Sequence, residues 1–142
     1  MTQEEENKVV VRRLVDELHN GGKVELAGEF FGKACILHFP RTPGPLQGTE
    51  AIKGFVAMIH STFPDFHITI EDMIAEGEKV VVRGTISGTF KDAFAGIPPT
   101  GQSATWTATG VYHVVDGKVV EVWEDVDMLG GFQRLGVIPA LA

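Results

Sequence analysis

The residues best suited to chemistry gather near the end of the chain, within residues 105–128. Alternate positions of two runs carry Thr109 and His113, and then Trp123, Asp125 and Asp127. Alternate residues of a strand point to the same side, so each set shares one face. Carboxylates beside an imidazole can transfer protons, and an indole supplies a flat apolar wall. The pattern predicts a pocket with a polar floor; the alternative is a sheet surface that faces solvent.

The register of the two runs decides whether the polar sets meet. Asp116-Gly117 lies between them and predicts a β-hairpin. A two-residue turn would pair Val115 with Lys118 and would set polar residues opposite apolar ones. A three-residue turn, with Gly117 as a bulge, pairs Val114 with Lys118 and brings His113 onto the face of the carboxylates. We predict the three-residue turn, because a slip of one residue flips every side chain.

The residues between these polar positions are mostly apolar, and they form the other face of the hairpin. They are Trp106, Ala108, Gly110, Tyr112 and Val114 in the first run, and Val120, Val122, Glu124, Val126 and Met128 in the second. If the polar face lines a pocket, this apolar face lies outside and needs a cover, which predicts a homodimer. If the apolar face instead meets the helices, the polar set lies outside and loses its place in a pocket.

The first half of the chain predicts helices and the second half predicts strands. Helices are expected at residues 3–19, 24–31 and 50–62, and strands at 66–75 and 79–90, before the hairpin. Gly84 and Gly88 mark places where a strand can bend. The order predicts an α+β fold, with N-terminal helices packed on a strongly curved antiparallel sheet that forms a cone. Such a cone is a natural site for a hydrophobic small molecule.

Two further residues are candidates for lining that site. His38 lies in the apolar segment 34–39, either as a hydrogen-bonded histidine at the edge of the core or as a pocket-lining residue. Phe94 lies in residues 91–101, a loop whose apolar content indicates a cover and not a bare linker.

Composition excludes several classes of function. The 142 residues suit a single domain, 1–142, and the net charge of −7 argues against a nucleic-acid partner. The lone Cys35 and the scattered histidines indicate no metal site. With no basic and apolar leader and no apolar run near 18 residues, we expect a soluble, cytoplasmic protein without a membrane partner.

Several segments in a fixed order resemble one known family. They are Phe63-Pro64-Asp65, residues 75–80, Val82-Arg83, Gly88-Thr89, residues 96–101, residues 116–123, Asp127 and residues 133–136. Together they resemble the SnoaL-like polyketide cyclases and the related ester cyclases, members of the nuclear-transport-factor-2-like superfamily of α+β cones. The resemblance implies an enzyme that closes a ring by an intramolecular aldol reaction of a polyketide ester, with no metal and no cofactor.

The resemblance also implies roles for particular residues. Asp127, four positions after Trp123, matches the family's general acid/base, and His113 on the paired strand matches its assisting histidine. Asp125 is then a second charge beside Asp127, and we expect Trp123, Asp125, Thr109, His38 and Phe94 to contact the substrate. Because one fold supports several reactions, isomerisation, dehydration and epoxide hydrolysis stay open, as does a non-catalytic binding or dimerisation module.

Overall fold

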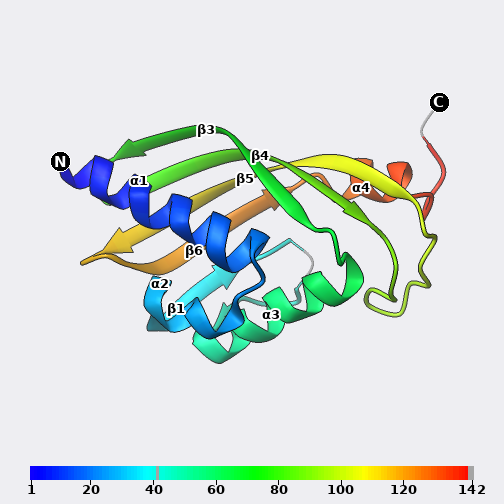
Figure 1. Ribbon diagram of the computed structural model, residues 1–142, viewed down its shortest axis with the longest axis horizontal. Coiled ribbons are helices and arrows are strands. Elements are labelled where there is room, and N and C mark those ends of the chain that lie inside the picture. Colours follow the sequence, from blue (N-terminus) through cyan, green and yellow to red (C-terminus); the bar gives the residue numbers. More distant parts are fainter. Residues whose placement is uncertain (41, 141–142) are drawn as a thin grey trace.

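The computed structural model describes residues 1–40 and 42–140 and has an α+β fold, with helices packed against one side of a curled sheet (Figure 1). The helical elements are α1 (Gln3–Arg13), η1 (Leu14–Asn20), η2 (Val24–Leu26), α2 (Ala27–Phe30), α3 (Thr49–Thr62) and α4 (Met128–Arg134). The strands are β1 (Phe31–His38), β2 (Leu46–Gln47), β3 (His67–Glu76), β4 (Lys79–Thr89), β5 (Ser103–Val115) and β6 (Lys118–Val126). In these residues no helix is long and apolar enough to cross a membrane.

The sheet confirms the predicted fold class. Within the described part of the chain it has six strands in the order β2-β1-β6-β5-β4-β3, and it curls without closing. Neighbouring strands are antiparallel except β1 and β6, which are parallel. The expectation of a purely antiparallel sheet did not include this pair.

The first helix changes its winding before it ends. Residues 3–19 were expected to form one amphipathic helix, but η1 is a π-helix, and its wider turn is closed by the Gly21 N–H, which donates to the Asp16 carbonyl. The Asn20 side chain then bonds both backbone groups of Ile68 in β3, donating at 2.9 Å and accepting at 2.7 Å. This pair of bonds fixes the end of the helix against the sheet.

The predicted three-residue turn in the β5–β6 hairpin is wrong. Val115 pairs with Lys118, and Asp116 (φ 50°) and Gly117 (φ 76°) form a two-residue turn with both φ angles positive. A β-bulge follows directly, because Val114 pairs with Val119 while His113 pairs with Glu121. The extra residue in β6 restores the register, so the polar sets do share one face, as expected.

That shared polar face points away from the helices, so the prediction that it lines the cone is wrong. Trp106, Tyr112, Val114 and Val122 are buried against the helices and core, whereas Thr109 on the other face is exposed. Burial follows the apolar side chains, because their removal from water drives the packing of the sheet on the helices. The argument for a homodimer from an uncovered apolar face therefore falls away.

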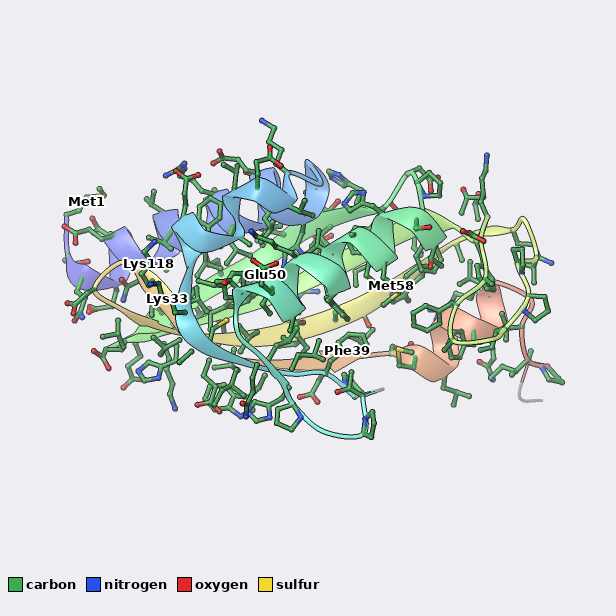
Figure 2. All side chains as sticks on the ribbon, turned by 90° about the horizontal axis from the view of Figure 1, so that it is seen from below. Met1, Lys33, Phe39, Glu50, Met58 and Lys118 are labelled. Carbon is green, nitrogen blue, oxygen red and sulfur yellow. The ribbon has the colours of Figure 1, made fainter. Side chains whose placement is uncertain are left out.

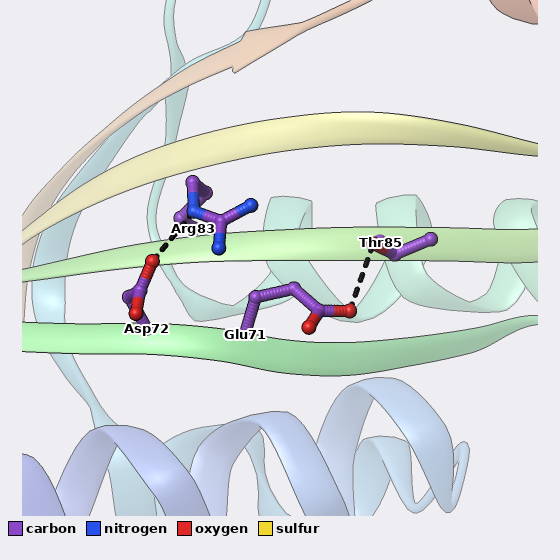
Figure 3. A network of polar contacts seen from close by, with 4 residues as sticks. All are labelled: Glu71, Asp72, Arg83 and Thr85. Atoms are coloured by element: carbon purple, nitrogen blue, oxygen red, sulfur yellow. Dashed lines mark hydrogen bonds and ion pairs between the residues drawn. The ribbon is translucent and has the colours of Figure 1, made fainter.

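A second bulge shapes the outer face of the sheet between β3 and β4. Ile70 pairs with Gly84 and Asp72 with Arg83, so Glu71 is the extra residue in β3. Figure 3 shows the outcome: Asp72 accepts a bond from Arg83 at 2.6 Å, and Glu71 accepts one from Thr85 at 3.0 Å. Arg83 is thereby held at the surface and contributes no charge to the inside of the cone.

Gly88 in β4 allows the α3 end to pack closely on the sheet. A Cβ at this position would lie 3.1 Å from Phe63, the residue that ends α3. Phe63 in turn packs on Phe90 and Trp106, with ring centroids 5.9 and 5.4 Å apart. The missing side chain of Gly88 therefore positions an aromatic cluster.

We predict that Gly88→Ala destabilises the protein by about 1–3 kcal/mol, because the added methyl forces Phe63 out of its packing. Gly54→Ala in α3 is the matched control: its Cβ meets nothing within 4 Å, so it should stabilise by about 0.5–1 kcal/mol. Urea denaturation of the three proteins measures both changes. A Gly88→Ala variant as stable as the unmodified protein would contradict the packing argument.

Candidate active site

An apolar cavity of about 100 Å³ lies between α3, the β4–β6 part of the sheet and α4. Aromatic and aliphatic side chains form most of its wall, among them Phe63, Phe66, Ile86, Trp106, Val126 and Phe132. Among the described residues, the wall also includes the polar residues His19, His60, Glu124 and Asp127. Few polar groups on an apolar wall are typical of small-molecule sites.

Glu124 carries a carboxyl group on the inner face of β6. It pairs with Gly110 of β5, and a Cβ on Gly110 would come within 3.2 Å of both carboxyl oxygens. Gly110 thus leaves the space that the carboxyl group occupies. The buried Tyr112 hydroxyl donates a hydrogen bond to Glu124 Oε1 at 3.2 Å and orients it.

Burial raises the pKa of Glu124 from 4.5 to about 7. The cause is the loss of water around the carboxylate; the Tyr112 hydrogen bond opposes this rise, and the negative charge of Asp125 adds to it. A carboxyl group with a pKa near neutrality exists in both protonation states at pH 7. It is therefore suited to both accept and return a proton.

His19 brings an imidazole to the same cavity from the end of η1. Burial and the nearby His60 lower the pKa of His19 to about 4, so the ring is neutral at pH 7. His60 Nε2 lies within hydrogen-bonding distance of the His19 backbone oxygen, and the Asn20–Ile68 bonds fix the next residue. With the described residues, the His19 ring itself makes no hydrogen bond, which leaves its nitrogens available to a ligand.

Asp127 lies at the wall of the cavity, at the start of α4. Its Oδ1 caps that helix by accepting the Gly130 N–H at 2.9 Å, and its Oδ2 lies 3.7 Å from Arg134 Nη1. A Cβ on Gly130 would overlap Asp127, so the glycine makes room for the cap. The structure thus shows a capping role for Asp127 and leaves its predicted acid/base role as a proposal.

His113, Thr109 and Asp125 lie on the outer face of the sheet. His113 Nε2 is 2.9 Å from Glu78 Oε1, and Thr109 and Asp125 are a cross-strand pair exposed to solvent. The prediction that His113 and Asp127 share an inward face is wrong, because Asp127 follows the end of β6 whereas His113 belongs to the solvent-facing set. None of the three outer residues lines the inner cavity.

His38 and Trp123 also meet on the outer face, on the parallel strands β1 and β6. Their rings stack with centroids 5.6 Å apart and an interplanar angle of 9°, and His38 Nε2 lies 2.6 Å from Glu121 Oε2. Lys79 Nζ sits 5.4 Å from the centre of the Trp123 ring. The structure brings these two predicted residues together, but on a shallow outer groove and not in the inner cavity.

Phe94 lies where a covering loop would place it, on the wall of the inner cavity. A tight turn holds it: Phe94 and Ile97 exchange backbone hydrogen bonds of 3.0 and 2.8 Å across Ala95 and Gly96. Ala95 has φ 49°, an uncommon angle for a residue with a side chain. The left-handed backbone of Ala95 completes the turn that holds Phe94 at the cavity wall.

Sequence reasoning missed Glu124 and His19. Glu124 was visible as the one charged residue in the apolar set of the hairpin, and a carboxyl group there signals a buried acid. His19 also had a signal, because it follows the buried Val15 by four positions, the spacing that places two residues on the same face of a helix. Among the described residues, no three His, Cys, Asp or Glu side chains are arranged to hold a metal ion.

Comparison with known proteins places the chain in a family. Residues 9–135 match the family model of the SnoaL-like polyketide cyclases. The chain is 28% identical to aklanonic acid methyl ester cyclase DauD of Streptomyces sp. (strain C5), over 89% of this chain and 80% of that one. For DnrD of Streptomyces peucetius, an enzyme of the same name, the values are 26%, 89% and 88%. A solved structure from Jannaschia sp. CCS1, assigned as a SnoaL-like polyketide cyclase, superposes with a TM-score of 0.88 at 25% identity, covering 98% of both chains.

We predict that Glu124→Gln changes how stability depends on pH. In the unmodified protein the folded state holds the Glu124 proton more tightly than the unfolded state, so stability falls as pH rises from about 4.5 to 7. The glutamine cannot ionise, so the variant should gain up to roughly 3 kcal/mol relative to the unmodified protein between pH 4.5 and pH 8. Urea denaturation at both pH values measures the difference.

Two features make this comparison selective. The contribution of His19 to the stability of the protein changes in the opposite direction, because it is lost as pH falls from 6.5 toward 4. This loss occurs in both proteins, so it cancels in the difference between them. Asp125→Asn is the matched control on the outer face: it removes only a minor contribution to the Glu124 pKa and should reduce the pH dependence slightly. Equal pH dependence in Glu124→Gln and the unmodified protein would mean that Glu124 ionises normally.

Proposed function

The chain belongs to the SnoaL-like polyketide cyclase family, and we propose that it closes a ring in a polyketide ester by an intramolecular aldol reaction in the inner cavity. The observation that carries the proposal is Glu124, a carboxyl group with a pKa near 7 on a mostly apolar wall. Such a group can move protons without a metal or an organic cofactor. The relatives are named for aklanonic acid methyl ester, so we propose a substrate of that class.

In the proposed reaction, the Glu124 carboxylate removes a proton from the carbon next to a substrate carbonyl. The resulting enolate carbon attacks a second carbonyl carbon of the same molecule and forms the ring bond. The attacked carbonyl oxygen becomes an alkoxide and takes the proton back from the Glu124 carboxylic acid. One carbon–carbon bond forms and Glu124 ends in its starting state, so the balance needs no oxidant or reductant.

His19 is proposed to stabilise the negative oxygen of the enolate. Its neutral ring can donate one hydrogen bond into the cavity without bringing a positive charge near Glu124. Tyr112 is a positioning residue, since its hydroxyl holds the Glu124 carboxyl group. The apolar wall excludes water, which strengthens both interactions.

Asp127 is the second candidate for the proton-transfer group, because it lines the same cavity and matches the family's acid/base position. Its bond to Gly130 occupies one carboxylate oxygen, which favours Glu124 for this role. His113 faces Glu78 on the outer side of the sheet, so the proposal gives it no contact with the substrate.

We predict that Glu124→Gln lowers kcat/KM for aklanonic acid methyl ester by about 10²–10⁴, the usual contribution of a general base. In the unmodified protein, kcat/KM should rise with pH with a midpoint near 7, as the Glu124 carboxylate forms. Tyr112→Phe should move this midpoint upward, because it removes the hydrogen bond that lowers the Glu124 pKa. Product formation followed by chromatography over pH 5–9 gives all three results.

Asp127→Asn is the matched carboxyl-to-amide control in the same cavity. Asparagine caps a helix as well as aspartate does, so only the charge of Asp127 near Arg134 and the helix N-terminus is lost; we expect a loss of less than about 1 kcal/mol in stability and a small change in kcat/KM. Full turnover by Glu124→Gln together with loss of turnover in Asp127→Asn would move the proton transfer to Asp127. Full turnover by both variants would overturn the proposed mechanism.

A further inference from the structure

The inner cavity is too small for the substrate that the proposed function requires. Its volume is about 100 Å³, whereas an engineered cavity of about 150 Å³ holds a single benzene ring. Pockets for larger organic ligands have volumes of about 300–1,000 Å³. A polycyclic ester therefore extends beyond the cavity that contains Glu124.

A larger apolar groove lies next to this cavity on the molecular surface. It has a volume of about 440 Å³ and runs between α3 and the segments that follow β1 and β4. Figure 2 shows the molecule from this side, with labels on Met58 in α3 and on Phe39, the residue that follows β1. Among the described residues, its wall contains no charged side chain, and the hydroxyl of Thr42 is its polar group.

Three phenylalanines separate the two spaces. Phe39, Phe55 and Phe94 line both the inner cavity and the groove. Phe39 packs edge-on against Phe55 with centroids 4.9 Å apart. Phe39 and Phe94 both lie in segments between regular elements, so aromatic side chains, and not the backbone of a strand, form the boundary between the two spaces.

We infer that the groove is the outer part of the substrate site and binds the non-reacting rings of a flat, apolar polycyclic ester. The inference rests on the proposed function, since the reacting carbonyl groups must then reach Glu124 in the inner cavity. The apolar side chains that line the groove favour apolar rings, because contact between them removes apolar surface from water. Met58 at the edge of the groove can adapt its shape to rings of different outline.

Gly54→Leu tests the groove without disturbing the inner cavity. Gly54 lies in α3 on the wall of the groove, and a Cβ there meets nothing within 4 Å, so the leucine fills the groove and keeps the helix intact. Gly28→Leu is the matched control, because Gly28 is also helical with an open Cβ position but lies outside both spaces.

Two uncharged probes separate the compartments: methyl anthraquinone-2-carboxylate, with three fused rings, and methyl acetoacetate, which is small enough for the inner cavity. Each probe is titrated into the protein and its binding is followed by protein NMR. Gly54→Leu should weaken binding of the anthraquinone ester by about tenfold or more, and a tenfold change in Kd corresponds to about 1.4 kcal/mol of binding free energy. Binding of methyl acetoacetate should change less than about twofold, and Gly28→Leu should leave both affinities unchanged.

The outcomes distinguish this inference from the proposed function. Unchanged affinity of Gly54→Leu for the anthraquinone ester, or equal weakening of both probes, would overturn the role of the groove. Failure of the unmodified protein to bind either probe would overturn the groove and the substrate class together. Full turnover by both Glu124→Gln and Asp127→Asn would overturn the mechanism. If Gly54→Leu still weakened binding of the anthraquinone ester and not of methyl acetoacetate, the groove would remain a binding site.

Discussion

The desolvation of one carboxyl group, that of Glu124, is the constraint on which the arrangement of the inner site depends. An ionised carboxylate loses several kcal/mol of hydration free energy when it enters an apolar space. The group therefore stays protonated to a higher pH, which means that its pKa rises. The structure limits this penalty in two ways: Tyr112 donates a hydrogen bond, and Gly110 leaves space for the carboxyl group. Both residues belong to β5, so the site depends on how β5 pairs with β6.

The bulge after the Asp116-Gly117 turn sets that pairing. A tight two-residue turn alone would put Asp125 inside and Glu124 outside, since a shift of one residue exchanges the two faces of a strand. The extra residue in β6 removes this conflict and places Val119 and Val122 together in the core, although an odd number of positions separates them. A local irregularity of one residue thus determines which of two adjacent acids faces the cavity.

Much of the fold could be predicted from the sequence, because helical and strand periodicities differ and each element follows its own period. The pattern also identified which hairpin residues share a face. The prediction that the polar set lies inside was wrong, because period-2 alternation shows only which side chains lie together, and their hydrophobicity decides which set is buried. Tyr112, Val114 and Val122 outweigh one Glu124 in the buried set. The polar set of the hairpin lies at the surface, where charged groups keep their water.

The π-helical winding of η1 could not be predicted, because it has no sequence signature in this segment. The place of His19 could be, because it follows the buried Val15 by four positions, on the same face of a helix. The effect of His19 on the site is specific. Burial shifts the pKa of His19 downward and that of Glu124 upward, and both shifts have one cause, the loss of water around a charge. A protonated His19 in the same cavity would stabilise the Glu124 carboxylate and lower its pKa, which would weaken it as a base. The electrostatic effect of the nearby His60 also lowers the pKa of His19 and so disfavours this protonation. The apolar wall therefore does more than hold a ligand: the loss of water along it keeps the His19 imidazole uncharged at pH 7 and raises the pKa of the Glu124 carboxyl group to about 7.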